Sequence, residues 1–296
     1  MRAFLIAFIV LSALLPAAAD AAPKNGRIVF GNINELLSLR SDGSDARVVT
    51  DKWEHQEVSG SPDGTQLVTT ANEAIVFVSA ADGSEVGRIE RPGEFFLGSA
   101  EWSPRGSELA YQECDKSEFT DIDECVTWGI YRIPVAGGTR KRVAEGVDPN
   151  WSADGRWLTF LHKVRPHDKN GNECYGIYVA RRDGSKLRRV YPRAKRCVGS
   201  LEIGFARPFF GPRRRSILFG AGDGLWRVRL DGTHKRRVLR ASRGRNVFLS
   251  RLSPDQKRIA YTADGGVWVT SASRGGRGKR IAAARYANAL EWLVAR

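Results

Sequence analysis

A short turn sequence that returns along the chain constrains its fold more than any other feature. The first copy is Ser61-Pro62-Asp63-Gly64, in which proline presets the second turn position, aspartate hydrogen-bonds its own backbone and glycine tolerates a positive φ. Related turns follow at 103–106, 152–155, 211–214 and 253–256. After each turn come two short strands and a hairpin turn that leads into a third. A period of about 45 residues with four strands per unit predicts a β-propeller.

The two ends of the sequence predict how the ring closes. Near the N-terminus the chain supplies strands at 27–30, 35–39 and 47–49, with no inner strand before them. Residues 289–293 form a lone first strand, and Trp292 stands where other units carry an aromatic residue before the turn. The last strand is therefore expected to complete the first blade. The predicted fold is all-β, with six four-stranded antiparallel blades.

These motifs resemble those of the TolB-like six-bladed β-propellers, whose WD40-like (PD40) repeat combines an aromatic residue, Ser-Pro-Asp-Gly, an Ile-Tyr-Val strand and an Asp-Gly turn. The matching residues are Trp102-Ser103-Pro104, Trp151 to Gly155, Ile130-Tyr131, Ile177-Tyr178-Val179 and the turns at Asp183 and Asp231. The resemblance covers residues 26–296 and implies the fold. Because the same repeat occurs in binding proteins, lyases and accessory domains of peptidases, it does not imply one function. TolB also carries an α/β domain before its propeller; no such domain is expected here, so its roles are not carried over.

The first residues are typical of a secretory signal peptide. Met1-Arg2 precedes the apolar run Ala3 to Leu15, and small residues follow, with cleavage expected after Ala19 or Ala21. The run is short for a membrane span, and an uncleaved anchor is the alternative. We expect a signal peptide at 1–22, a propeller domain at 23–296, no transmembrane span in the mature chain, and an extracytoplasmic location, either secreted or periplasmic.

The chain is strongly basic, with a net charge of +14 and a pI near 10.0. Such a charge draws a protein to anionic surfaces, although the expected secretion argues against nucleic acid as the partner. Many basic residues fall on the predicted outer strands, at 140–142, 186–189, 235–237 and 279–280. There they either deter edge-to-edge pairing or contact an acidic glycan, lipid headgroups or a protein. The run Arg213-Arg214-Arg215 lies in a turn and is a better candidate contact patch.

Three long loops, at 114–127, 162–174 and 191–202, are expected on the face opposite the Ser-Pro-Asp-Gly turns, because strand direction alternates within a blade. They hold all four cysteines, and we predict the disulfides Cys114–Cys125 and Cys174–Cys197. A zinc site is the alternative, but no Cys-x-x-Cys pair supports it.

The same loops are rich in oxygen ligands. The acidic residues of the first loop are Asp115, Glu118, Asp121, Asp123 and Glu124, and the second contains Asp168 to Glu173. These groups either bind calcium or are hydrated, and the second loop departs from the EF-hand pattern because Glu173 stands where glycine is needed. No other metal or cofactor is expected.

Polar residues of the inner strands form the second candidate site. They lie two positions before the turns or two residues earlier still: Ser59, Glu101, Asn150, Arg251 and Glu291, together with Glu57, Asp148 and Arg207. Side chains near the mouth of a propeller channel converge from all blades, so this set can bind a small polar ligand or a peptide terminus. The alternative is a lining that is paired with itself and with water.

Catalytic motifs are lacking. The sequence has no Gly-x-Ser-x-Gly elbow, and its four histidines, His55, His162, His167 and His234, are expected at the surface. We therefore predict a non-catalytic binding or scaffolding propeller that contacts a protein or an anionic cell-envelope component through its disulfide-tied loop face. The alternative is a polysaccharide-directed lyase or hydrolase at the channel mouth, using Glu101 with Asp148 or Glu291.

Overall fold

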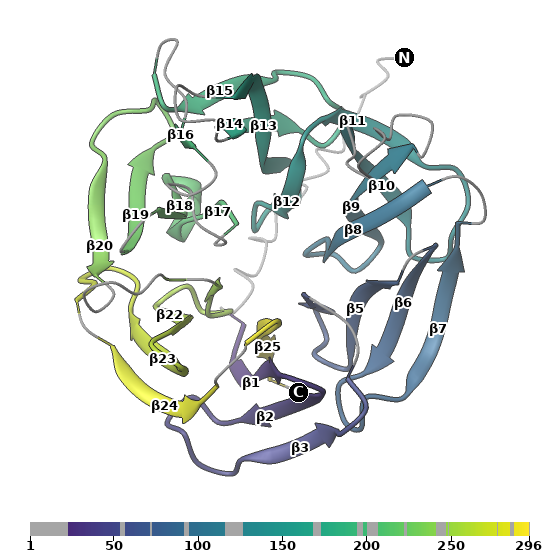
Figure 1. Cartoon of the computed structure of the whole chain (residues 1–296), viewed down its shortest axis with the longest axis vertical. Helices are drawn as coiled ribbons and strands as arrows, with labels where there is room; N and C mark the ends of the chain where they lie inside the picture. Colours follow the sequence, from purple (N-terminus) through teal and green to yellow (C-terminus); the bar gives the residue numbers. More distant parts are fainter. Residues whose placement is uncertain are drawn as a thin grey trace, which may run out of the picture.

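Six antiparallel sheets surround a central axis, as the sequence predicts (Figure 1). The structure is a computed structural model. It describes residues 23–53, 57–71, 73–91, 95–115, 127–167, 173–193, 198–199, 207–221, 224–240, 247, 249–276, 278–284 and 287–295. Each sheet is a blade whose first strand lies nearest the axis and whose last strand lies at the outer rim.

The blades follow one another in chain order. Blade 1 contains β25 (Leu290–Val294), β1 (Asn25–Asn32), β2 (Glu35–Leu39) and β3 (Arg47–Thr50). Blade 2 contains β4 (Ser59–Gly60), β5 (Gln66–Ala71), β6 (Ala74–Ser79) and β7 (Glu85–Glu90). Blade 3 contains β8 (Phe95–Trp102), β9 (Glu108–Asp115), β10 (Trp128–Pro134) and β11 (Lys141–Glu145).

The remaining blades repeat this order. Blade 4 contains β12 (Val147–Trp151), β13 (Trp157–His167), β14 (Glu173–Arg181) and β15 (Arg188–Tyr191), and the short β16 (Val198–Gly199) also pairs with β14. Blade 5 contains β17 (Phe209–Phe210), β18 (Ser216–Ala221), β19 (Gly224–Arg229) and β20 (Arg236–Arg240). Blade 6 contains β21 (Ser250–Leu252), β22 (Arg258–Ala263), β23 (Gly266–Ser271) and β24 (Lys279–Ala283).

The hydrophobic core consists of six clusters, one between each pair of neighbouring blades. Successive strand residues point to opposite faces, so Val29 of β1 packs toward blade 2 whereas Ile28 and Phe30 pack toward blade 6. Several second and third strands, such as β6 and β18, are consequently buried on both faces and almost continuously apolar. This packing explains why a single blade cannot be stable alone.

The turns that end the inner strands of blades 2, 4 and 6 are held by their serine and aspartate side chains. In the first copy, the Ser61 hydroxyl donates to Asp63 Oδ1 over 2.5 Å and accepts from the Gln66 N–H over 3.0 Å. Gly64 closes the turn with φ of +68°. The same contacts recur in the fourth and sixth blades, so the sequence motif is a self-contained cap on the inner strands of these three blades.

The predicted ring closure is confirmed. The last strand β25 pairs antiparallel with β1, matching Ile28 with Trp292 and Phe30 with Leu290. Blade 1 is therefore built from both ends of the chain. At the opposite end of the same strands, Ala295 N–H donates to Lys24 C=O over 2.8 Å.

One loop begins later than the sequence suggests. We expected a loop from His162 onward, but β13 continues to His167 and β14 resumes at Glu173. The extension forms because His162 pairs with Gly176 and Lys163 with Tyr175, and two bulges follow. His162 therefore lies in a strand. Its ring is edge-on to that of Tyr178, with 4.9 Å between the two ring centroids.

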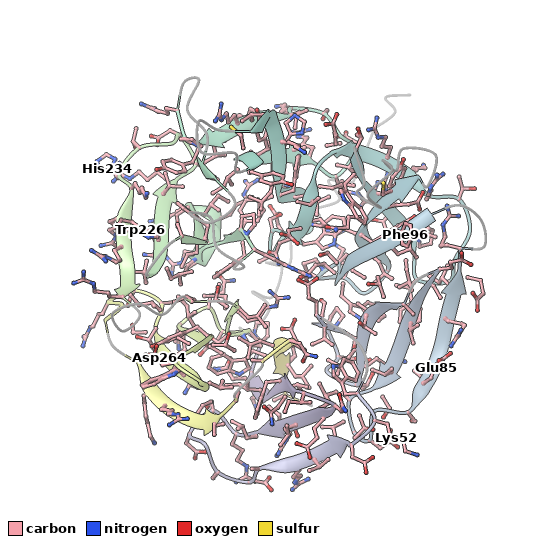
Figure 2. The ribbon with its side chains drawn as sticks, viewed as in Figure 1. Lys52, Glu85, Phe96, Trp226, His234 and Asp264 are labelled. Carbon is pink, nitrogen blue, oxygen red and sulfur yellow. The ribbon has the colours of Figure 1, made fainter. Side chains whose placement is uncertain are left out.

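The outer strands carry the basic residues that the sequence placed there. Strands β11, β15, β20 and β24 each begin with two exposed or partly exposed basic residues. Strand β7 differs, because Glu85 and Glu90 flank Arg88 and pair with it. Figure 2 shows Glu85 and His234, which precedes β20, on opposite sides of the ring. The charge is thus unevenly distributed around the propeller.

Candidate ligand-binding site

A cavity of about 440 Å³ lies where the inner strands end, at the channel mouth surrounded by the Ser-Pro-Asp-Gly turns. Its wall includes residues from all six blades, since every inner strand reaches the axis (Figure 1). The predicted channel residues Glu101, Asn150, Arg251 and Glu291 all line it, and so does Ser59. The volume lies within the range of small-molecule sites.

The other three predicted residues meet below the cavity, further from the turns. Arg207 is the centre of this group, and its side chain is only 2% exposed. Its Nε lies 3.1 Å from Glu57 Oε1 and 3.4 Å from Asp148 Oδ1. Its Nη1 donates to Glu101 Oε1 over 3.1 Å. One guanidinium thus joins carboxylates of three different blades across the axis.

Arg251 connects the same cluster to blade 1. Its Nη2 donates to Glu101 Oε1 over 3.0 Å, and its Nε donates to Glu291 Oε2 over 3.3 Å. Glu101 Oε1 therefore accepts from two guanidinium groups. These contacts agree with the alternative that the polar groups of the channel lining pair with one another. The pairing fixes the position of each side chain, and it does not exclude a ligand in the cavity above them.

We call Glu57, Glu101, Asp148, Arg207, Arg251 and Glu291 the axial ion cluster. It contains four carboxylates but only two guanidinium groups. Burial, together with the charge of Glu291, raises the pKa of Glu101 to about 7, although Arg251 opposes the shift. Burial also raises the pKa of Asp148 and of Glu291. The cluster therefore holds a proton near neutral pH.

The two guanidinium groups respond differently to burial. Burial and the charge of Arg251 lower the pKa of Arg207 well below its usual range. Arg251 is also buried, but Glu101 and Glu291 outweigh that effect and raise its pKa. Arg251 consequently holds its positive charge more strongly than Arg207 does.

An unusual backbone turns the cluster toward the axis. Glu57, Ser99 and Asp148 occupy equivalent places in blades 2, 3 and 4, and all have left-handed φ, between 44° and 58°. Irregularities in the pairing of β8 and β12 accompany two of them. Residues other than glycine rarely adopt this conformation, and such strain collects at functional sites.

Ser99 is a member of the site that sequence reasoning missed. Its hydroxyl accepts from Arg207 Nη2 over 2.8 Å and lies 2.9 Å from Glu57 Oε2 and 3.0 Å from Asp148 Oδ1. A single serine in β8 carries no motif that predicts this role. Only its position, two residues before Glu101, offers a signal, because Glu57 and Asp148 hold that position in adjacent blades.

Aromatic side chains form much of the cavity wall: Trp102, Trp151, Trp292, Phe209 and Phe210. Trp151 Nε1 donates to the Glu101 carbonyl over 3.3 Å. Within the described part of the chain, the buried Nε1 atoms of Trp102 and Trp292 have no hydrogen-bond partner. Blade 2 has Gly60 where four of the other blades carry an aromatic residue and blade 6 carries Leu252, and the side chain of Leu293 packs against Gly60.

The predicted loop-face features fall largely outside the described residues. Cys114 and Cys174 are fully buried, and neither is a free thiol. Their expected partners Cys125 and Cys197, and the acidic residues 118–124 and 168–172, lie outside the described ranges. The disulfide pairing and the calcium site therefore stay predictions. Among the described residues, no group of three or more His, Cys, Asp or Glu side chains is arranged to hold a metal ion.

Two of the four histidines can be placed. His234 is exposed, as expected, whereas His162 is partly buried with its Nδ1 3.1 Å from the Glu145 carbonyl oxygen. The other two, His55 and the side chain of His167, lie outside the description. In the described residues, helices long and apolar enough to cross a membrane do not occur.

Solved structures with the same architecture are numerous. No protein-family model and no curated protein matches the sequence. A putative TolB from Agrobacterium tumefaciens is similar over 91% of this chain and 94% of its own, with a TM-score of 0.64 and 20% identity. This chain is a TolB-like six-bladed propeller in its fold.

Other structures with this fold have different roles. This chain is also similar to a chain of a nidogen/laminin complex, with a TM-score of 0.64, 13% identity, and coverage of 90% of this chain and 98% of that one. An oligogalacturonate lyase in complex with manganese gives a TM-score of 0.55 and 13% identity, over 84% of this chain and 70% of its own. Binding proteins and enzymes thus share the TolB-like fold, and the site must decide between them.

Proposed function

We propose that this chain is an extracytoplasmic, non-catalytic binding propeller that takes a protein or an anionic cell-envelope component as its partner. The signal-peptide pattern at residues 1–22 supports the location. The basic charge supports the anionic partner, because it attracts such a partner over a long range.

The axial ion cluster carries the non-catalytic part of the proposal. A general base needs a lone pair that faces its substrate. Glu101, by contrast, accepts from Arg207 and Arg251 through one oxygen, and its side chain is only 6% exposed. Glu291 is held by Arg251 and by the N–H of Trp292 over 2.8 Å. Such a cluster suits a rigid cavity floor, which lowers the entropic cost of binding.

The loop face is the second contact surface of this proposal. Its disulfides would fix the loops of blades 3 and 4 in shape before a partner arrives. Replacing Cys114 or Cys174 by serine is expected to weaken partner capture there. The cavity, on the opposite face, should keep its own ligand affinity in such variants.

Capture from the native envelope tests the proposal. The mature, oxidised protein is crosslinked to envelope and culture-fluid components at low and high salt, and captured proteins and glycans are identified by mass spectrometry. A specific partner that persists at high salt supports a binding module, because screened charge alone would release it. If neither Cys114→Ser nor Glu101→Ala changes the amount of partner captured, then neither the loop face nor the channel mouth is the contact surface.

A polysaccharide-directed lyase or hydrolase is the second candidate. The observation that favours it is the pKa of Glu101, since a value of about 7 suits a general acid or base at neutral pH. Oligogalacturonate lyase structures share the fold. This candidate predicts turnover of an acidic glycan by purified protein, together with its loss in Glu101→Ala or Asp148→Ala. Turnover that both variants retain contradicts it.

A further inference from the structure

The hairpins that lead from the third strand into the outer strand carry most of the protein's net charge. In blade 4, residues 181–189 contain five basic residues and one acidic residue, a net charge of +4. In blade 5, residues 229–237 contain four basic residues and one acidic residue, a net charge of +3. Residues 134–142 of blade 3 and 271–280 of blade 6 contain three and four basic residues and no acidic one. The net charge of these four segments together, +14, equals that of the whole chain.

Blades 1 and 2 lack this charge. Their corresponding segments, 39–48 and 79–87, have net charges of 0 and −2. Glu85 marks the acidic side of the ring in Figure 2, and His234 marks the basic side. Protection of edge strands needs charge on the outer strands but not charge of one sign, and β7 carries a mixture. Edge protection therefore does not explain why blades 3 to 6 accumulate positive charge that repels itself.

The outer strands and their hairpins form a continuous belt around the rim (Figure 1). Each turn glycine of blades 4 to 6 lies so close to the preceding outer strand that a Cβ atom would come within 2.7 Å of a carbonyl oxygen: Gly184 at Val143, Gly232 at Val190 and Gly275 at Val238. Arg188 Nη1 also donates to the Leu230 carbonyl of the next hairpin over 2.7 Å. The basic segments therefore follow one another along one track.

An aromatic ring of the third strand stands opposite an arginine in each basic segment. The cross-strand pairs are Tyr131 with Arg142, Tyr178 with Arg189, Trp226 with Arg237, and Trp268 with Arg280. In blade 5, the guanidinium carbon of Arg237 lies 5.1 Å from the Trp226 ring centroid, and Lys235 Nζ lies 4.3 Å from it. A cation–π contact holds a side chain in place without neutralising its charge. Such rings lower the entropic cost of binding an anion.

Few carboxylates neutralise these segments. Arg140 pairs with Glu113 at 2.8 Å, and Arg182 pairs with Glu108 at 2.9 Å. The segments' own Asp183 accepts from the Ser185 hydroxyl of the same turn. Within the part of the chain that the structure describes, the following exposed residues form no ion pair within 4 Å: Lys141, Arg142, Lys186, Arg188, Lys235 and Arg236.

We propose that these segments bind a linear, phosphate-bearing polymer of the cell envelope, of the poly(glycerol phosphate) kind. We call them the rim belt, which consists of residues 134–142, 181–189, 229–237, 271–276 and 278–280. A flexible chain can follow the belt and reach all four blades, whereas a flat bilayer touches a convex rim at only one or two of them. This inference names the anionic partner of the proposed binding function and rests on that function.

The composition of the rim belt favours phosphate over carboxylate. Eleven of its fifteen basic residues are arginines, whose planar forks bind phosphate oxygens in pairs. The oxygens of a phosphodiester are arranged tetrahedrally, so guanidinium groups can approach them from several directions. The two oxygens of a carboxylate lie in one plane, which suits fewer of the orientations along a curved belt.

The rim belt suits a polymer without bases better than a nucleic acid. Single-stranded nucleic acids bind proteins through bases that stack on exposed aromatic rings. The rings of the belt are covered by cations of the protein itself: Trp226 carries Lys235 and Arg237, and the Arg140 guanidinium carbon lies 4.6 Å from the Tyr131 ring centroid. Bases would therefore add no contact to that of the phosphates.

Fluorescence anisotropy with the mature, oxidised protein tests the proposal. The probe is a labelled poly(glycerol phosphate) of about ten units, long enough for several phosphate contacts. The competitors, added at equal accessible charge, are oligothymidylate, polyglutamate, and vesicles of phosphatidylcholine with phosphatidylglycerol. The belt variant removes one exposed charge from each of blades 3, 4 and 5: Arg142→Gln, Lys186→Gln and Arg236→Gln together.

The control variant removes the same charge from the same three blades, at the turns that end their inner strands: Arg105→Gln, Arg156→Gln and Arg213→Gln together. These turns lie three strand spacings from the outer strand, about 14 Å, which exceeds the Debye length of about 10 Å at 0.1 M salt. Arg214 is kept because it packs on Trp157, with its guanidinium carbon 5.3 Å from a ring centroid. It occupies the turn position of Gly64 with a left-handed φ of 52°.

The belt variant should lose at least about tenfold in affinity for the polymer. Its plot of log affinity against log salt concentration should also become shallower by about 2, because each phosphate contact contributes about 0.7 to the slope. The control variant should stay within about threefold of wild type and keep the wild-type slope, because its charges lie beyond the screening length.

No binding of the polymer at low salt, or equal losses in the two variants, overturns the rim belt as a binding site and leaves its charges to edge protection. Stronger competition by oligothymidylate, polyglutamate or the vesicles than by unlabelled polymer overturns the phosphate polymer as the ligand. Capture of a protein through the loop face is measured separately with Cys114→Ser, so failure of this inference is distinguishable from failure of the proposed function.

Discussion

The pKa of Glu101 makes a quantitative prediction about stability. The folded protein holds the Glu101 proton with a pKa of about 7, against an ordinary value of 4.5. Each pKa unit corresponds to about 1.36 kcal/mol, so the shift amounts to about 3 kcal/mol. Between pH 4.5 and 7 the folded state binds more protons than the unfolded state, so the free energy of unfolding falls as pH rises. The contribution is fully present below pH 4.5 and is lost above pH 7.

Glu101→Gln removes this titration while keeping the shape of the side chain. The difference in unfolding free energy between variant and wild type should therefore move by about 3 kcal/mol in favour of the variant from pH 4.5 to pH 7.5. Because Glu101 and Glu291 interact, the midpoint of the change belongs to the pair. Urea unfolding followed by tryptophan fluorescence at several pH values measures the difference.

The control is Glu90→Gln, which changes a carboxylate to an amide on the exposed strand β7. Its stability difference from wild type should stay constant, within about 0.5 kcal/mol, as expected for a surface substitution. If the Glu101→Gln and wild-type curves run parallel over the whole pH range, burial of Glu101 in the axial ion cluster does not perturb its protonation, and the reasoning fails.

Three further perturbations test other parts of the structure. Arg207→Met should lower the free energy of unfolding by about 3 to 5 kcal/mol at pH 8, measured by urea unfolding, because it leaves buried carboxylates without their guanidinium. A decrease below about 1 kcal/mol would contradict the stabilising role of the Arg207 ion pairs. Arg214→Gly should raise stability by about 1 kcal/mol through relief of the left-handed backbone, seen as a higher Tm, and an unchanged or lower Tm would argue against strain there. Deleting residues 288–296 removes β25, so cooperative unfolding should be lost in fluorescence and calorimetry; a wild-type midpoint would show that blade 1 does not need it.

The fold could be predicted because its signals are local and repeated. Each turn such as Ser61 to Gly64 caps itself through its own side chains, so its geometry follows from four or five consecutive residues. The ring closure followed from counting strands at the two ends. Extension of β13 to His167 was missed because bulged pairing depends on the partner strand, which the sequence does not display.

The sequence predicts which residues belong to the candidate site, but it does not predict which of them contact one another. Alternation along the inner strands indicated that Glu101, Arg251 and Glu291 face the axis. The contacts of Arg207 with three other blades depend on the width of the channel, which the sequence does not show. The role of Ser99 depends on a left-handed backbone that its residue type does not predict. The sequence likewise shows that Arg214 stands at the turn position of Gly64, but not that it keeps the left-handed conformation of a glycine there.

The pairing of β1 with β25 also sets a timetable for the newly made chain. Strand β1 leaves the ribosome early, and its inner partner follows about 260 residues later, a wait of roughly 15 to 50 s at ordinary rates of synthesis. During that time the apolar edge of the first blade has to be kept from other chains, in the manner that any exposed strand edge requires. The first blade can therefore form only after the last strand has been synthesised, and a chain that ends before β25 lacks the inner strand of this blade.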